Sequence, residues 1–223
     1  MATAASYRES AGGTEKSLML QLNVESLSRQ YGPRRVLDRL EFSVSGGSVL
    51  VVTGPNGAGK STLLRCLAGL ERPTSGRVTW LDEGRELDSS ARRRALGYVS
   101  PELALYDELT GIENLSFFAR LQALPSGERP VLDLLERVGL GTRGSDRVED
   151  YSSGMKQRLK WAFALLGNPA GLLLDEPGVT LDSSGFALSG ELIRQACEQG
   201  CVVVLATNDT REMEFGDERL TLG

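Results

Sequence analysis

The sequence predicts an α/β fold in which a mostly parallel β-sheet is flanked by helices on both faces. Short apolar runs such as Leu172–Leu174 and Cys201–Ala206 lack polar alternation and are typical of strands buried on both faces. These runs alternate along the chain with segments whose apolar residues recur at helical spacing. Strands that alternate with helices favour a parallel sheet covered on two sides.

The composition is that of a soluble globular protein. The chain has 223 residues, 40% of them hydrophobic and 25% charged, which suits one large domain with at most a small subdomain. A formal net charge of −5 gives no bulk reason to bind DNA or anionic lipid, so we expect no nucleic-acid partner. The apolar runs fall far short of the roughly 20 residues that cross a bilayer. We therefore expect the chain itself not to span a membrane.

The N-terminus and two residue types narrow the class further. Met1–Ser17 are small and polar and have no apolar signal region, so we expect a flexible tail, with either Met1 or Met19 as the start. The three cysteines form no C-x-x-C pair and are expected to be reduced thiols of a cytoplasmic protein. The chain contains no histidine, which excludes histidine-ligated metals and Ser-His or Cys-His catalysis.

The N-terminal part begins with segments that alternate apolar and polar residues, and this period of two predicts paired strands. A β-branched run then ends in a glycine-rich turn that leads into a helix. The expected strands are Leu20–Val24, Leu40–Val44, Ser48–Thr53, Arg77–Leu81 and Leu96–Val99, and the expected helix is Lys60–Gly69. A polar stretch from Asp82 to Arg94 separates the last two strands.

The remainder of the chain is expected to be helical first and α/β afterwards. Thr110-x-x-Glu113 is a capping box that opens a helix through Leu121. Pro130 and the apolar residues that follow it at helical spacing predict a second helix, ending near Gly139. Met155–Leu166 and a segment around Phe186–Ile193 are also expected to be helices, the latter before the strand that ends at Ala206.

The strongest chemical signal is a glycine-rich loop between a strand and a helix. Residues 54–61 match G-x-x-x-x-G-K-[ST], in which glycines let backbone N–H groups converge on phosphate oxygens. Lys60 would reach the β- and γ-phosphates, and Ser61 would offer an oxygen to Mg²⁺. The nucleotide-binding residues predicted here are Gly54, Pro55, Asn56, Gly57, Ala58, Gly59, Lys60, Ser61 and Thr62.

A second signal is the pair of carboxylates that ends the apolar strand at Leu174. The carboxyl end of a strand is where α/β sheets place ligands. Asp175 can hold Mg²⁺, directly or through water, and Glu176 can orient or deprotonate the attacking water. By itself such a pair is more often a solvated strand end, and the nearby phosphate loop favours the catalytic interpretation.

The segment Tyr151–Arg158, before these carboxylates, resembles the signature motif of ABC ATPases. The resemblance covers about residues 18–223 and implies a P-loop NTPase of ABC type. The resemblance also implies an N-terminal antiparallel β subdomain and a helical subdomain inserted at roughly 100–158. The cofactors it implies are ATP and Mg²⁺. It implies a dimer, with itself or a homologous ATPase subunit, in which Ser152, Ser153, Gly154 and Met155 contact ATP on the partner; a plain Ser-Ser helix cap is the alternative.

Other positions match the motifs of the ABC ATPase family less closely. Tyr31 resembles the aromatic that stacks on adenine, with plain packing as the alternative, and Asp182 resembles the loop that crosses to the partner or caps a helix. Pro101 stands where the family has a glutamine that senses Mg²⁺, and whether the adjacent Glu102 replaces it stays open. Asn208 stands where the family has a histidine, so that residue can donate a hydrogen bond but cannot titrate near neutrality.

These features favour the ATP-hydrolysing subunit of an ABC transporter, with Glu176, Lys60, Asp175 and Asn208 as catalytic residues. Separate transmembrane permease subunits would provide its only membrane contact, at the inner face of the cell membrane. The motif variants resemble exporters of the ABC-2 kind, including the haem-exporter ATPase of cytochrome c maturation. The alternatives are a soluble non-transport ABC ATPase or a weakly hydrolysing partner in a heterodimer. Phe117, Phe118 and Leu121 lie where the family docks its permease, but at least two of them are expected to be helix core.

Overall fold

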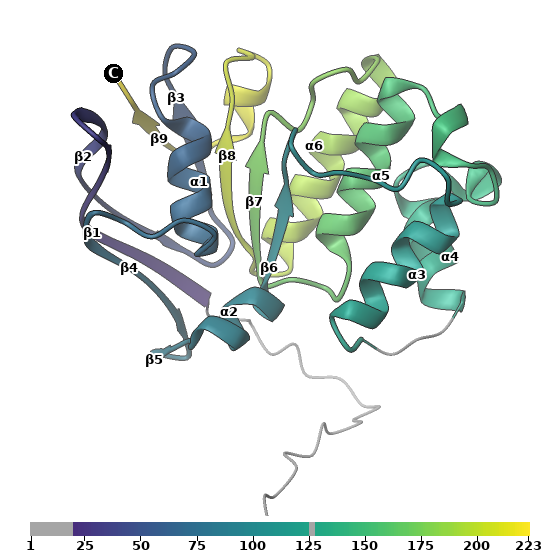
Figure 1. The fold of residues 1–223 in the computed structure, drawn as a ribbon, viewed down its shortest axis with the longest axis horizontal. Helices are drawn as coiled ribbons and strands as arrows, with labels where there is room; N and C mark the ends of the chain where they lie inside the picture. The colour runs from purple at the N-terminus through teal and green to yellow at the C-terminus, as the bar shows by residue number, and fades with distance from the viewer. Residues whose placement is uncertain (1–19, 125–127) are drawn as a thin grey trace, which may run out of the picture.

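The computed structural model describes residues 20–124 and 128–223, which form two β-sheets with helices between and beside them (Figure 1). The expected flexible tail, residues 1–17, and the alternative start Met19 lie outside the described residues. Within the described part of the chain, no helix is long and apolar enough to cross a bilayer.

The first sheet is antiparallel, with the strand order β2-β1-β4-β5. Its strands are β1 (Leu20–Tyr31), β2 (Arg34–Ser45), β4 (Ser75–Asp82) and β5 (Arg85–Glu86). β1 pairs antiparallel with both β2 and β4. The alternating segments near the N-terminus therefore form the paired strands that their period of two predicts.

The second sheet is parallel, with the strand order β6-β7-β8-β3-β9. Its strands are β3 (Val49–Thr53), β6 (Leu96–Val99), β7 (Gly171–Asp175), β8 (Val202–Ala206) and β9 (Glu218–Thr221). Every residue of β3, β7 and β8 is buried. The predicted parallel sheet with doubly covered strands is thus confirmed, because continuous apolar runs suit strands with a protein layer on each face.

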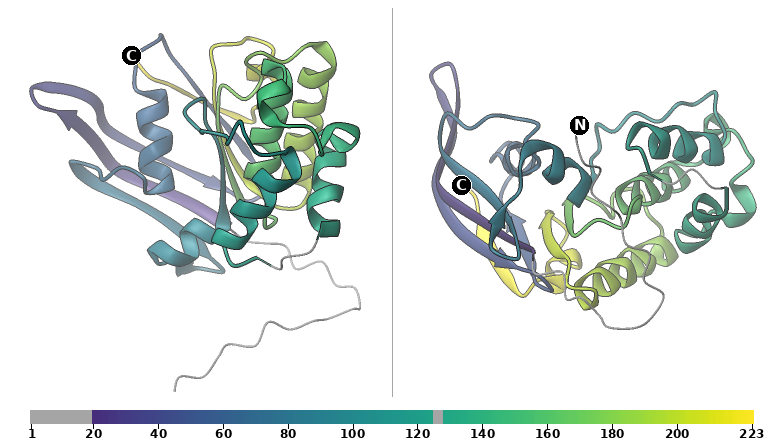
Figure 2. Two further views of the ribbon diagram at one scale, coloured as in Figure 1. Left: turned by 45° about the vertical axis from the view of Figure 1, so that its right-hand side comes forward. Right: turned by 90° about the horizontal axis from the view of Figure 1, so that it is seen from below.

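Helices cover both faces of the parallel sheet (Figures 1 and 2). α1 lies between the two sheets, whereas α5 and α6 pack against the opposite face, and α3 and α4 pack beside α5. The helices are α1 (Lys60–Ala68), α3 (Gly111–Leu121), α4 (Glu128–Arg137), α5 (Ser153–Leu165) and α6 (Ser183–Glu198), with 3-10 turns η1 (Gly141–Arg143), η2 (Val148–Asp150) and η3 (Glu212–Phe215). The predicted capping box is present at the start of α3, where Thr110 and Glu113 bond each other's backbone N–H.

Successive residues of the central strands enter two hydrophobic cores because side chains alternate across a strand. Leu172 and Leu174 of β7 pack in the core beneath α5 and α6, and Leu173 packs in the core that contains Leu63 of α1 and Trp80 of the antiparallel sheet. This double burial fixes the strand register, since a shift by one residue would exchange the two faces. The carboxyl ends of β3, β7 and β8 are thereby held side by side.

One α-helix and two strands were not predicted. α2 (Ser89–Ala95) and β5 lie in the stretch expected only to be polar, and β9 follows the last predicted strand. α2 has no buried residue, so it shows no apolar period; Asp88 caps it by accepting from the N–H groups of Ser90 and Ala91. The expectation that at least two of Phe117, Phe118 and Leu121 are helix core was also wrong, because Phe117 is 38% exposed and Leu121 is 66% exposed.

Candidate nucleotide-binding site

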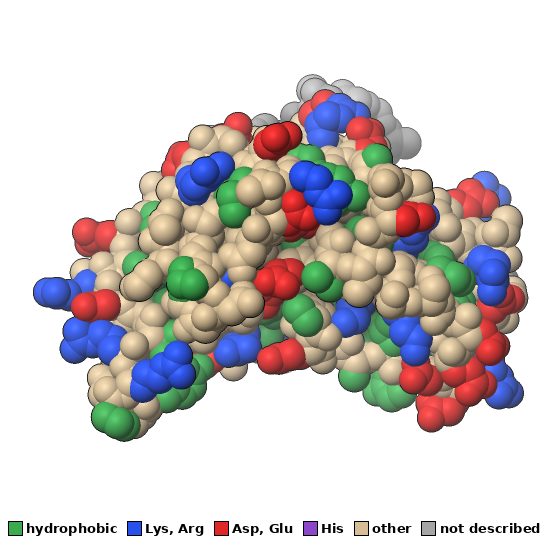
Figure 3. Space-filling model, turned by 90° about the horizontal axis from the view of Figure 1, so that it is seen from above, with side chains coloured by type: hydrophobic (Ala, Val, Ile, Leu, Met, Phe, Trp, Pro, Cys, Tyr) green, Lys and Arg blue, Asp and Glu red, His purple; other side chains and the backbone are tan. Residues whose placement is uncertain are grey.

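The predicted phosphate-loop and catalytic residues gather at one edge of the parallel sheet. β3, β7 and β8 end at the same edge, and the loops that follow them carry the glycine-rich motif, Glu176 and Asn208. The strands run toward the top of Figure 1, and Figure 3 looks down on this edge, where acidic and basic side chains are interspersed. Ligands of open α/β sheets bind at such an edge.

The glycine-rich loop has a backbone that only glycine accepts at two points. Gly54 has φ 145°, and a Cβ there would lie 2.4 Å from the carbonyl oxygen of Leu222. Gly59 has φ 103°, and a Cβ there would lie 2.7 Å from a methyl group of Val36. The loop is therefore held close to its neighbours by the absence of side chains, as the motif requires.

The N-terminus of α1 opens into a cavity without a side-chain cap. Gly59 is the N-cap and makes no side-chain cap bond, and the first helical bond runs from the N–H of Leu63 to the carbonyl of Gly59, 2.8 Å. The N–H groups of Lys60, Ser61 and Thr62 precede that bond, and groups in this position lack helical acceptors. Together with the helix dipole, they form an anion-binding site.

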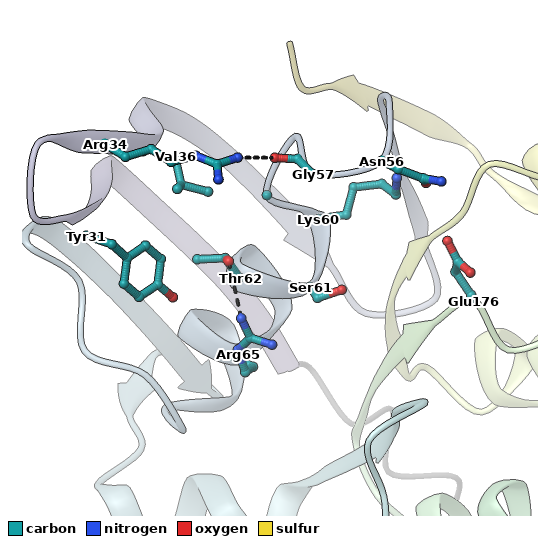
Figure 4. Close-up of a pocket in the computed structure, with 11 residues that line it drawn as sticks. Tyr31, Arg34, Val36, Asn56, Gly57, Lys60, Ser61, Thr62, Arg65 and Glu176 are labelled. Carbon is teal, nitrogen blue, oxygen red and sulfur yellow. Dashed lines mark hydrogen bonds between the residues drawn. The ribbon is translucent and has the colours of Figure 1, made fainter.

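The cavity has a volume of about 410 Å³ and extends from Tyr31 to Glu176, with Lys60 and Ser61 between them (Figure 4). Its walls come from β1, β2, the glycine loop, α1 and the loop after β7. The lining residues are Tyr31, Arg34, Val36, Asn56, Gly57, Gly59, Lys60, Ser61, Thr62, Arg65 and Glu176. An aromatic ring at one end and a carboxylate at the other suit an elongated ligand with an apolar base and a charged tail.

Asp175 and Ser61 form the oxygen pair expected to hold a cation. Asp175 is only 4% exposed, and burial raises the pKa of its carboxyl, while a hydrogen bond from Ser61 acts in the opposite direction. No group of three or more His, Cys, Asp or Glu that could hold a metal occurs in the described residues. A divalent ion here therefore needs ligand oxygens from elsewhere, as Mg²⁺ does when it binds one carboxylate together with substrate phosphates.

Lys60 and Asn208 meet across the site. The ammonium of Lys60 donates to the side-chain oxygen of Asn208 at 3.1 Å and to the carbonyl of Gly54 at 2.7 Å. The Asn208 amide in turn donates to the side chain of Asn56 at 2.7 Å. The loop after β8 thus contacts the glycine loop after β3, which places Asn208 beside the phosphate-binding residues that the sequence predicts.

Tyr31 sits at the far end of the cavity, and its ring is held by three charged side chains. Its hydroxyl donates to Glu71, and the guanidinium of Arg29 lies 4.4 Å from the ring centroid. Glu71 also pairs with Arg29 at 2.5 Å and with Arg65 at 3.2 Å. Tyr31 is 41% exposed, which leaves part of its ring open to a flat base beside the guanidinium of Arg29.

The signature residues lie away from this cavity, on the start of α5. The helix begins at Ser153, two residues before the predicted start, and Ser152 caps it by accepting from the N–H of Met155 at 3.2 Å. Ser153 lines a separate cavity of about 390 Å³. Within one chain, the described structure therefore does not bring Ser152–Met155 onto the glycine loop. Asp182 caps α6 by accepting from the N–H of Gly185 at 2.7 Å.

The Pro101–Glu102 segment is held between two helices. Glu102 pairs with Arg65 of α1 at 3.5 Å, and Lys160 of α5 donates to the carbonyl of Pro101 at 2.7 Å. Glu102 is thus close to the nucleotide cavity, on the side of Arg65. Sequence reasoning missed Arg65, although it lies three and four residues after Thr62 and Ser61, a spacing that places these side chains on the same helix face.

Residues 37–179, more than half of the chain, match the ABC transporter family, and the chain belongs to that family. Its fold is that of an ATP-binding cassette. It superimposes with a TM-score of 0.80 on an ATP-binding subunit of an ABC transporter, at 30% identity over 90% of this chain and 85% of that one. A dimeric cassette, MJ0796, solved in a post-hydrolysis state with ADP and Pi, matches with a TM-score of 0.80 at 25% identity, covering 90% and 94% of the two chains.

Named relatives include ATP-binding proteins of resistance and transport systems. The chain is 33% identical over 201 residues to the linearmycin resistance ATP-binding protein LnrL of Bacillus subtilis (strain 168), covering 89% of this chain and 65% of that protein. It is 35% identical over 193 residues to the lantibiotic transport ATP-binding protein SrtF of Streptococcus pyogenes, covering 86% and 82%. The chain thus spans just under two thirds of the length of LnrL.

Proposed function

We propose that this chain binds and hydrolyses ATP as the nucleotide-binding subunit of an ABC transporter. The observation that carries the proposal is the cavity at the sheet edge, where the uncapped N-terminus of α1, Lys60 and Glu176 surround one space with an aromatic ring at its far end. The proposal takes residues 18–223 as the ATPase domain, with a helical subdomain at roughly 100–158. ATP would lie with its base toward Tyr31 and its phosphates on the glycine loop.

Each residue then has a defined task. The N–H groups at the start of α1 and the ammonium of Lys60 bind phosphate oxygens, which requires Lys60 to exchange one of its bonds to Gly54, Pro55 and Asn208 for one to phosphate. Ser61 and Asp175 would hold Mg²⁺, which supplies charge neutralisation at the phosphates when bound. Glu176 orients or deprotonates the attacking water, and Asn208 donates a hydrogen bond.

The geometry of a single chain supports a dimer. Ser152–Met155 begin α5 outside the cavity, so their predicted contact with ATP needs a second copy or a homologous subunit. The dimeric MJ0796 cassette shows that a chain with this fold assembles in pairs. ATP would then be enclosed between the glycine loop of one subunit and the signature residues of the other.

Transport, rather than another use of ATP, is supported by the relatives and by one exposed surface. LnrL and SrtF are named for resistance and for lantibiotic transport, which favours export. Tyr106, Phe117 and Phe118 form an aromatic cluster whose ring centroids lie 5.2–6.1 Å apart, and Tyr106 is 45% exposed. We propose that permease subunits dock here and hold the chain at the cytoplasmic face of the membrane. A haem cargo stays a prediction from the motif variants.

Co-purification tests the transport function. The tagged chain should be recovered from detergent-solubilised membranes of its own cells with a transmembrane subunit attached. A variant carrying Phe117→Ala and Leu121→Ala should lose that subunit while it still binds ATP, and Leu70→Ala, at a residue 66% exposed elsewhere on the surface, should retain it. Recovery of the wild-type chain without any membrane subunit would contradict the proposal and favour a soluble non-transport ATPase.

A further inference from the structure

Glu176 has a strained backbone that its surroundings must hold. Its φ is 48°, in the left-handed region that residues with a side chain rarely adopt. Such strain persists only where neighbouring contacts hold the conformation in place. The N–H of Glu176 donates to the carbonyl of Ala206 at 2.9 Å, which attaches the residue to β8.

The next two residues are anchored by side chains from two different segments. The carbonyl of Pro177 accepts from Gln157 at 2.9 Å and from Trp161 at 3.3 Å, both on α5. The N–H of Gly178 donates to the carboxylate of Glu212 at 2.7 Å. Glu212 follows the loop after β8, so this second anchor comes from the segment that also carries Asn208.

Glu212 is a buried carboxylate with two partners. It is only 2% exposed, and its second oxygen accepts from the hydroxyl of Thr207, itself 1% exposed. Thr207 immediately precedes Asn208, and its hydroxyl also accepts from the N–H of Asp209 at 2.9 Å. Burial raises the pKa of Glu212, so placing an ionised carboxylate here has a cost in stability.

We propose that Glu212 is a positioning residue for ATP hydrolysis, because its buried carboxylate ties the backbone just after Glu176 to the loop that carries Asn208. The inference rests on the proposed ATPase function. Glu212 does not line the nucleotide cavity, and it acts through Gly178 and Thr207. It keeps the carboxylate of Glu176 and the amide of Asn208 at a fixed separation, on which placement of the attacking water depends.

Three variants test the assignment. Glu212→Ala removes both acceptors, and we expect kcat for ATP to fall by about 30- to 100-fold while KM changes by less than about threefold, since the glycine loop is untouched. Glu212→Gln can accept from Gly178 and donate to Thr207, so its kcat should stay within about fivefold of wild type. Ser189→Ala is the stability control, because Ser189 is 1% exposed and its hydroxyl bonds the carbonyl of Phe186, away from the site.

Amide hydrogen exchange in the nucleotide-free protein gives a readout that does not depend on turnover. The N–H of Gly178 should exchange at least about tenfold faster in Glu212→Ala than in wild type, and at the wild-type rate in Glu212→Gln. Unchanged exchange in Glu212→Ala, or a loss of kcat no larger than in Ser189→Ala, would overturn the proposal. Absence of hydrolysis by the wild type would instead overturn the ATPase function, and the exchange result would still decide whether Glu212 anchors Gly178.

If Glu212→Ala does not fold, Thr207→Val leaves Glu212 in place and removes the hydroxyl that donates to it, together with the bond that this hydroxyl accepts from the N–H of Asp209. We expect kcat to fall by about five- to tenfold in this variant and to recover in Thr207→Ser, which restores the hydroxyl. Equal kcat in Thr207→Val and wild type would overturn the assignment.

Discussion

The glycine loop after β3 and the Glu176 loop after β7 border the same cavity, yet they are held in different ways. The first is shaped by residues within it, since the positive φ values of Gly54, Gly57 and Gly59 need no side-chain support. The second places a non-glycine residue at φ 48° and is held by contacts from β8, α5 and Glu212. We therefore expect the conformation of the glycine loop to depend mainly on its own residues. The conformation of the Glu176 loop should also change when residues elsewhere in the chain are substituted.

The largest effect is expected from a substitution that removes the catalytic carboxylate of the second loop. Glu176→Gln keeps the shape of the side chain but removes its ability to accept a proton, so we expect kcat to fall by at least about 100-fold. ATP should still bind and should hold the variant as a stable dimer. Steady-state ATP hydrolysis and size-exclusion chromatography with and without ATP measure the two outcomes.

Glu108→Gln, at an exposed position outside the cavity, is the matched control and should hydrolyse ATP like the wild type. Unchanged turnover in Glu176→Gln would show that the catalytic carboxylate has been misassigned. A fall in turnover without an ATP-dependent dimer would contradict the proposed dimer and leave the catalytic assignment standing.

The next effect tests the locally encoded loop. In Gly54→Ala the new Cβ would lie 2.4 Å from a backbone carbonyl oxygen, so the loop must move, and we expect the free energy of unfolding to fall by about 2–4 kcal/mol. Gly84→Ala is the control, because Gly84 also has a positive φ, 78°, but a Cβ there meets nothing within 4 Å. It should cost only about 1 kcal/mol. Denaturant unfolding measures both, and equal losses would show that φ alone, rather than close approach, requires glycine at position 54.

This contrast also explains how far sequence reasoning reached. The parallel sheet, the glycine loop and Asp175 were predictable because each is encoded within a few neighbouring residues, as an apolar run or a fixed spacing. No local sequence pattern distinguishes Glu212, which is one acidic residue in a short 3-10 turn. Its proposed role depends on its hydrogen bond from Gly178, 34 residues earlier in the chain. The contacts of Arg65 with Glu71 and Glu102 are likewise set by tertiary packing.

A smaller effect, on stability, follows from the buried carboxylate of Glu212. Burial first, and then the nearby carboxylates of Asp209 and Glu176, raise its pKa above the ordinary 4.5, against the hydrogen bonds from Thr207 and Gly178. The folded state therefore holds this proton more tightly than the unfolded state, so the free energy of unfolding decreases as pH rises from about 4.5 through the folded pKa.

Comparison with Glu212→Gln isolates this contribution. The difference in unfolding free energy, wild type minus variant, should decrease over that pH range with a slope no steeper than about 1.4 kcal/mol per pH unit, the value for one proton. Urea unfolding at a series of pH values measures it. A difference that grows with pH would mean that the hydrogen bonds to the ionised carboxylate outweigh its burial.

The smallest expected effect lies where the two loops meet, at Asn208, which contacts Lys60 and Asn56 of the glycine loop. Asparagine does not titrate and the chain has no histidine, so the pH dependence of kcat should show no ionisation attributable to imidazole between about pH 6 and 7. Asn208→His should introduce one, with kcat changing by about two- to fivefold across that interval. Asn168→His, in the turn after α5, is the control and should leave the profile unchanged. A wild-type ionisation in this interval that survives Glu176→Gln would show that another group where the two loops meet titrates.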